Sequence, residues 1–187
     1  VGLTSDQVRF VGSLGADYGV IVVSADSPYQ NLDDLVNAIK ADPGGIAFGG
    51  GSAVGGFDHI KVLQVLRAAD FTDITAVPYV ALDGGADAIL QVTGGHLAAM
   101  TGDITETVPF MEDIRILAVL SEERLPGDFA DIPTAVEQGY DVVAPNWRGF
   151  YIPKEAGDEA FDYWANALGT LYNSDEWQQV MTDNGLM

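Results

Sequence analysis

The chain has 187 residues, 48% of them hydrophobic, and carries 28 acidic against 8 basic residues, for a formal net charge of −20. This length and composition can bury a core and exclude a disordered chain, and no apolar run reaches the roughly 18 to 20 residues of a membrane helix. The negative field excludes nucleic acid and anionic lipid surfaces as partners, and the absence of cysteine excludes disulfides and thiolate chemistry.

Strand-like and helix-like patterns alternate along the first half of the chain, which is typical of βα units with a mainly parallel sheet. Residues 18–23 have the pattern of a buried strand, and the apolar residues of 32–40 recur at helical spacing. A short strand is predicted over residues 46–48, running directly into a glycine-rich loop. A helix over about 56–69 and a strand over 74–79 follow.

The second half continues the same alternation. Asp83-Gly84-Gly85 is predicted to open a helix that Gly94-Gly95 ends through a left-handed cap. Ser174 is expected to cap the last helix. The remaining strands are predicted over residues 97–100, 114–120 and 147–152, and the remaining helices over 105–111, 133–138, 158–171 and 175–184.

The strongest functional signal is the run GGGSAVGGFDH at residues 49–59. It lies between a short strand and a helix, where free backbone N–H groups and the helix dipole favour an anion. Its glycines allow a ligand to approach the backbone closely, and Ser52 adds a hydroxyl donor. The run is therefore predicted to bind an anion without lysine or arginine. The alternative is a plain tight turn between strand and helix.

Familiar phosphate and nucleophile motifs do not fit this loop. A P-loop needs Lys and then Ser or Thr where Gly56 and Phe57 stand. At Val54, a dinucleotide fingerprint needs glycine or alanine and a nucleophile elbow needs glycine. For His59, beside Asp58, a packed and hydrogen-bonded histidine is favoured over a catalytic pair. No catalytic residue, metal site or cofactor is predicted.

Two further loops are expected at the same edge of the sheet, because ligands collect at the carboxyl ends of parallel strands. One contains Tyr79, which could donate a hydroxyl, and Asp83-Gly84-Gly85, where Asp83 is favoured as a helix N-cap over a ligand contact. The other follows the strand at 97–100 and offers Thr101 and Gly102. The sequence thus predicts a binding site built from three loops.

An ordered series of short motifs resembles one known family. The series is Val22-Val23, Ser27-Pro28, residues 32–40, Asp42-Pro43-Gly44, residues 49–59, Tyr79 with Asp83-Gly84-Gly85, Gly94-Gly95, residues 115–119, Ile132-Pro133-Thr134, Glu137-Gln138-Gly139-Tyr140 and Trp147-Arg148-Gly149. It is similar to the periplasmic solute-binding receptors of tripartite tricarboxylate transporters, the family that also contains the Bug receptors. Asp83-Gly84-Gly85 looks closer to the tricarboxylate receptors than to the other Bug proteins.

The resemblance implies an α/β, type II periplasmic-binding-protein-like fold, with two lobes, hinge strands and a carboxylate in the cleft. Residues 19–145 would form a nearly complete second, ligand-binding lobe with a mainly parallel sheet. Residues 1–18 and 146–187 would form the hinge strand and a remnant of the first lobe. Because family members carry a further segment before the point matching Val1, most of the first lobe is expected to be missing and binding to be weak. Arg148 would be the best-placed cation near the cleft.

The implied function is periplasmic capture of a carboxylate, citrate-like or a dicarboxylate, for delivery to the membrane subunits of the transporter, without catalysis. The alternatives are an α/β hydrolase or transferase acting on an anionic substrate through Ser52 or His59, and a sensor domain that presents the bound lobe to a partner. The predicted ligand contacts are Ser52, Ala53, Val54, Gly55, Tyr79, Asp83, Gly84, Gly85, Thr101 and Gly102.

Overall fold

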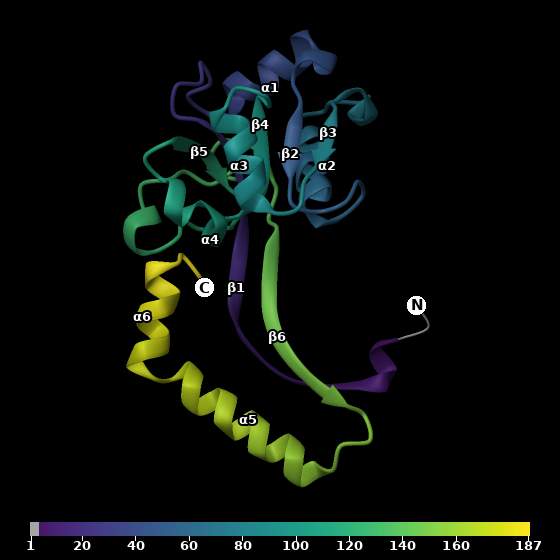
Figure 1. The fold of residues 1–187 in the computed structure, drawn as a ribbon, viewed down its shortest axis with the longest axis vertical. Helices are drawn as coiled ribbons and strands as arrows, with labels where there is room; N and C mark the ends of the chain where they lie inside the picture. Colours follow the sequence, from purple (N-terminus) through teal and green to yellow (C-terminus); the bar gives the residue numbers. More distant parts are fainter. Residues whose placement is uncertain (1–3) are drawn as a thin grey trace.

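A mixed β-sheet forms the main body of the structure, a computed structural model that describes residues 4–187 (Figure 1). The strand order is β3-β2-β4-β1-β5, with β6 paired to β1 outside this path. Strands β2, β3 and β4 run parallel, whereas β1 runs antiparallel to β4 and β5. The predicted α/β class is confirmed, but the sheet is mixed rather than mainly parallel, because β1 pairs antiparallel with β4, β5 and β6. The strands are β1 (Val8–Ser24), β2 (Phe48–Gly50), β3 (Tyr79–Ala81), β4 (Ala99–Asp103), β5 (Ile114–Val119) and β6 (Pro145–Pro153).

Helices cover both faces of this sheet, and the burial of β1 shows it. Ile21 and Val23 pack with residues of α1 and α2, whereas Val20 and Val22 pack with residues of α3, and all four side chains are fully buried. A strand covered on both faces has a continuous apolar run rather than an alternating one. The helices are α1 (Leu32–Ala41), α2 (Phe57–Ala68), α3 (Gly85–Thr93), α4 (Ile104–Thr107), α5 (Asp158–Tyr172) and α6 (Asp175–Asp183).

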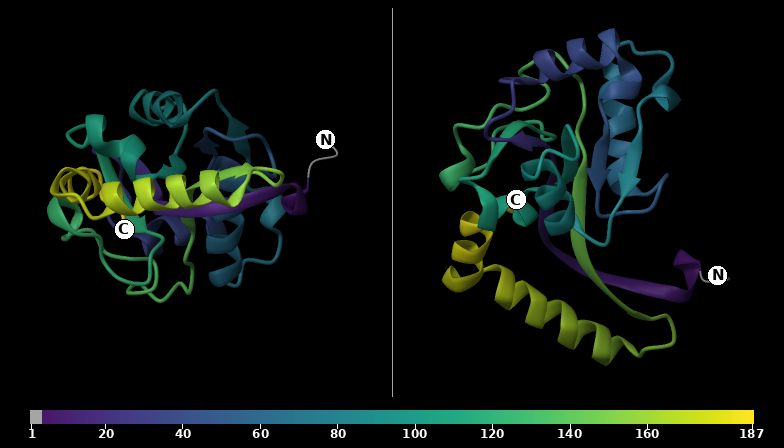
Figure 2. Two further views of the ribbon diagram at one scale, coloured as in Figure 1. Left: turned by 90° about the horizontal axis from the view of Figure 1, so that it is seen from below. Right: turned by 45° about the horizontal axis from the view of Figure 1, so that its top comes forward.

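The long strand β1 leaves the sheet and forms a two-stranded ribbon with β6 (Figure 1). The pairing runs from Val8 opposite Pro153 to Tyr18 opposite Pro145, and β1 then changes partner to β4 at Gly19. Helix α5 runs alongside the ribbon, and α6 returns the chain towards the main body (Figures 1 and 2). The backbone of Met187 hydrogen-bonds with that of Ala16, which attaches the end of the chain to β1.

Two predicted strands are displaced along the chain. The segment predicted as a strand over 74–79 contains a 3-10 turn at Ile74–Ala76, and β3 begins only at Tyr79 because Pro78 has no N–H for a sheet ladder. Strand β2 pairs Phe48 with Tyr79, which draws Gly49 and Gly50 into the sheet. The loop predicted over 49–59 is therefore shorter and comprises residues 51–56.

The predicted helix over 133–138 is wrong. The N–H of Ala135 donates to the carbonyl of Val119 at the end of β5, so the segment joins the sheet edge, and the turns that Gln138 and Gly139 close after it do not form a helix. Two of the predicted caps, at Ser174 and Gly95, are confirmed. Ser174 accepts a hydrogen bond from the N–H of Trp177, and Gly95 adopts a φ of 74° after α3.

Candidate functional site

The three loops predicted to bind a ligand meet at one edge of the sheet. A Cβ atom placed on Gly51 would lie 2.8 Å from the carbonyl carbon of Gly84 and the nitrogen of Gly85, so the first two loops touch through bare backbone. The side chain of Glu106 contacts both Gly85 and Gly102, which joins the third loop to them. This edge carries the carboxyl ends of β2, β3 and β4, where open α/β sheets bind ligands.

The loop at 51–56 satisfies part of its own hydrogen bonding. Ser52 Oγ accepts from the N–H of Asp58 at 2.9 Å and so caps the first turn of α2, and Gly55 N donates to His59 Nδ1 at 2.9 Å. Within residues 4–187, however, the consecutive N–H groups of Ser52, Ala53 and Val54 meet no acceptor. The loop therefore presents three adjacent backbone donors, while the Ser52 hydroxyl serves the helix as an acceptor.

Tyr79 holds this loop in place. Its hydroxyl donates to the carbonyl of Ser52 at 3.0 Å, and its ring stacks on that of His59 with centroids 4.4 Å apart. Burial lowers the pKa of His59, which favours the neutral ring that accepts from Gly55. The prediction of a packed, hydrogen-bonded histidine is confirmed. Tyr79, predicted as a ligand donor, instead has its hydroxyl committed to the loop.

The second loop supplies another group of backbone donors. Helix α3 has Gly84 as its N-cap and no side-chain cap, so the predicted cap at Asp83 is wrong: the helix begins one residue later, and Asp83 is exposed. No residue of the described chain accepts from the N–H groups of Gly85, Ala86 or Asp87. These donors adjoin the first group because Gly51 contacts Gly84 and Gly85.

Thr101 and Gly102, predicted as contacts from the third loop, are both buried in β4. Within residues 4–187, Thr101 Oγ1 is the one fully buried side-chain polar atom that has no hydrogen-bond partner. A buried hydroxyl without a partner costs folding free energy unless a ligand or water satisfies it.

Replacing Thr101 with valine is expected to raise the free energy of unfolding by about 1 kcal/mol, because valine keeps the shape and removes an unpaired hydroxyl. The matched control is Thr134→Val. Thr134 is also fully buried, but its hydroxyl accepts from the N–H of Glu137, so this change should destabilise the fold by about 1 kcal/mol. Urea unfolding of both variants measures the difference. Equal destabilisation by the two would show that Thr101 has a partner after all.

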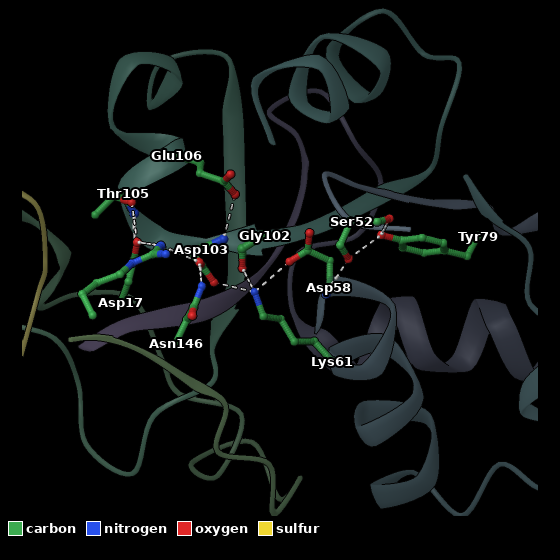
Figure 3. A network of polar contacts seen from close by, with 11 residues as sticks. Asp17, Ser52, Asp58, Lys61, Tyr79, Gly102, Asp103, Thr105, Glu106 and Asn146 are labelled. Carbon is green, nitrogen blue, oxygen red and sulfur yellow. Dashed lines mark hydrogen bonds and ion pairs between the residues drawn. The ribbon is translucent and has the colours of Figure 1, made fainter. Parts of the chain in front are cut away.

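A buried lysine lies beside Asp58 and Gly102 (Figure 3). Lys61 of α2 is fully buried, and its ammonium donates to Asp58 Oδ1 at 3.0 Å, to the carbonyl of Gly102 at 2.8 Å and to Asp103 Oδ1 at 2.5 Å. Lys61 is not among the residues predicted from the sequence. The available signal was its position four residues before Val65, on the buried face of the helix.

The network continues from Asp103 into the ribbon (Figure 3). Asp103 Oδ2 accepts from Asn146 Nδ2 at 2.5 Å and from Arg148 Nη2 at 3.1 Å, and Arg148 also binds Asp17 Oδ2 at 3.0 Å. Asp17 in turn accepts from the Thr105 hydroxyl at 2.6 Å. Arg148 lies near the site as predicted, but it is already paired with two carboxylates of its own chain.

Glu106 adds a further carboxylate at this edge. Its Oε2 accepts from the N–H of Asp103 at 2.9 Å and closes a capping box at the start of α4. Burial raises the pKa of Glu106, and the charges of Asp103 and Asp58 raise it further, while the backbone hydrogen bond from Asp103 and the charge of Lys61 act in the opposite direction. Among residues 4–187, no group of histidine and carboxylate side chains is arranged to hold a metal ion.

Comparison of the sequence with known proteins indicates one family. The sequence model for the receptor of the tripartite tricarboxylate transporter family matches residues 4–187. The protein BugT of Bordetella pertussis is 31% identical over 141 residues, which are 72% of this chain and 40% of that protein. A second Bordetella pertussis protein is 26% identical over 97% of this chain and 55% of its own length. The chain thus spans about half the length of these relatives.

Solved structures show the same fold. MatC from Rhodopseudomonas palustris with bound malate superposes with a TM-score of 0.82 at 18% identity, over 100% of this chain and 63% of that protein. A second R. palustris protein, with adipate, superposes with a TM-score of 0.84 at 18% identity, over 96% and 59%. A solute-binding protein from Polaromonas gives a TM-score of 0.74 at 24% identity, over 100% and 64%. No helix of the described residues is long and apolar enough to cross a bilayer.

Proposed function

This chain belongs to the receptor family of tripartite tricarboxylate transporters, and we propose that its three-loop edge binds a di- or tricarboxylate outside the cytoplasm. The family consists of solute-binding receptors rather than enzymes, so the expected event is reversible capture without turnover. The neighbours that contain malate and adipate support a carboxylate as the ligand. Delivery to the membrane subunits of a transporter, in the periplasm, is the role that the family suggests.

The observation that carries this proposal is the pair of free backbone donor groups at one sheet edge. The N–H groups of residues 52–54 and of residues 85–87 have no acceptor within residues 4–187, and Gly51 brings their two loops into contact. Residues 85–87 form the first turn of α3, and residues 52–54 lie in the loop that leads into α2; the aligned peptide dipoles at the start of a helix favour a negative charge. A carboxylate can therefore be held without a free cation. This arrangement suits a chain with a net charge of −20.

Gly84 offers a direct test, because a side chain there reaches open space. No atom lies within 4 Å of a Cβ atom built on Gly84, and its φ of 176° is extended backbone that any residue adopts. Gly84→Ala is therefore expected to leave the melting temperature unchanged and to weaken carboxylate binding by about tenfold or more, because its methyl group occupies the ligand's approach to the backbone. Isothermal titration calorimetry with malate, succinate, adipate and citrate measures the change.

The matched control is Gly157→Ala. Gly157 is likewise a helix N-cap with no atom within 4 Å of a built Cβ, but it precedes α5, far from the glycine loops (Figure 1). Its substitution should change neither stability nor affinity. Absence of binding by every carboxylate, or equal affinity of the Gly84→Ala variant and the parent chain, contradicts the proposed site.

A further inference from the structure

Glu106 places a carboxylate in the wall of the proposed site. A Cβ atom on Gly85 would lie 2.3 Å from Glu106 Oε2, and one on Gly102 would lie 2.4 Å from the same atom. The acid therefore fills the space that the two glycines leave free. A ligand group that reaches this part of the wall meets Glu106 instead of bare backbone.

Only one oxygen of Glu106 is engaged by the protein. Oε2 accepts from the N–H of Asp103, whereas Oε1 accepts from no group of residues 4–187. Among residues 4–187, the fully buried side-chain polar atom without a partner is Thr101 Oγ1. Glu106 Oε1 has no partner either, so it is not fully buried and is accessible to solvent. A carboxylate oxygen in this position can accept a hydrogen bond from a ligand.

The charges around Glu106 determine which ligand group is favoured there. Asp103 and Asp58 are acidic neighbours; Lys61 is already bound by both of them, and Arg148 is already paired with Asp103 and Asp17. An ionised ligand carboxylate beside Glu106 would therefore meet like charge, which is unfavourable in a partly buried site. A hydroxyl or an ammonium group would instead donate to Oε1. The free N–H groups of residues 52–54 remain available for the ligand's carboxylate.

We propose that Glu106 determines specificity at this site, selecting carboxylates that carry a hydroxyl or ammonium group over acids of the same length that carry neither. This inference rests on the proposed function, because it requires the glycine loops to bind a carboxylate. Beyond the proposed function, it assigns recognition of the ligand's hydroxyl or ammonium substituent to one side chain, that of Glu106. In this arrangement backbone donors recognise the acid, and an acceptor recognises its substituent.

The test compares malate, aspartate and succinate, which share a four-carbon dicarboxylate skeleton and differ in a hydroxyl, an ammonium or no substituent. Calorimetry on the 187-residue chain is expected to show malate or aspartate binding at least about tenfold more tightly than succinate. In Glu106→Gln the preference should fall below about threefold, because the amide can donate to a ligand carboxylate and carries no charge. The amide oxygen can still accept from the N–H of Asp103, so the capping box is retained.

Glu137→Gln is the matched control. Like Glu106, Glu137 accepts a hydrogen bond from the backbone N–H of the residue three positions before it, here Thr134, but it pairs with Arg124 near the β5 edge of the sheet. Its substitution should leave the preference unchanged. If no dicarboxylate binds the parent chain, the proposed function fails. If all three bind equally, or if Glu106→Gln keeps the preference, the role of Glu106 fails while the site stands. The equal-affinity outcome is measured on the parent chain, so it does not depend on the variant folding.

Discussion

Replacing Lys61 with methionine is expected to lower the free energy of unfolding by about 3 to 5 kcal/mol. Methionine fills a volume similar to that of lysine, so the loss of stability comes from removing the positive charge. Without the ammonium, Asp58 and Asp103 are left close together with side chains only 14% and 8% exposed, and the carbonyl of Gly102 loses its donor. Removing one partner of a buried ion pair costs far more than the net contribution of the pair.

Urea unfolding monitored by circular dichroism measures this effect. Lys40→Met is the control, because Lys40 lies exposed in the last turn of α1 and its loss should change stability by less than about 0.5 kcal/mol. Adding Asp103→Asn to Lys61→Met should recover part of the stability, since it removes one of the two carboxylates that face the lost ammonium, the one that Arg148 also pairs with. A Lys61→Met variant as stable as the parent chain would show that Lys61 is not an essential counter-charge.

Replacing Gly51 with alanine is expected to lower the free energy of unfolding by about 1 to 3 kcal/mol and to weaken carboxylate binding by more than about tenfold. The added Cβ would lie 2.8 Å from the carbonyl carbon of Gly84 and the nitrogen of Gly85. Both are backbone atoms, which cannot rotate away as a flexible side chain can. The two loops must therefore separate, and the donors at residues 52–54 move away from those at residues 85–87.

Gly44→Ala provides the control for this change. No atom lies within 4 Å of a Cβ built on Gly44, and its backbone is not left-handed, so alanine there should alter stability by less than about 0.5 kcal/mol. Affinities are compared by calorimetry well below the melting temperature of each variant, so that lost binding reflects loop geometry. Undiminished affinity in Gly51→Ala would mean that the ligand does not need the two loops in contact.

The network behind the loops connects the proposed site with the ribbon. From Lys61 the contacts pass through Asp103 to Asn146 and Arg148 of β6 and to Asp17 of β1. Each step is a hydrogen bond between side chains, and Asp17 and Lys61 are essentially fully buried. The position of helix α2, and with it the glycine loop, is therefore tied to the two long strands that leave the sheet.

Local signals in the sequence predicted much of the fold. The predicted start of the last helix at Ser174 follows from side-chain capping, and the predicted end of α3 at Gly95 follows from a left-handed backbone. Both signals depend on a few neighbouring residues. The positions of β2 and β3 were displaced, and the helix after Pro133 was wrong. Those features depend on pairing between distant segments, such as Ala135 with Val119 and Phe48 with Tyr79.

The sequence by itself determined the α/β class and the three glycine-bearing loops at one sheet edge, because βα alternation and glycine positions are local properties of the chain. Only the tertiary structure decided which donors stay free and which charges lie behind them. The hydroxyl of Ser52, predicted as a ligand donor, also accepts a hydrogen bond from the N–H of Asp58 in α2. Lys61 and Glu106 look like ordinary charged helix residues until β4 places Asp103 against the first and Gly102 against the second. Burial and pairing of a charge depend on partners brought together by folding, which no local pattern encodes.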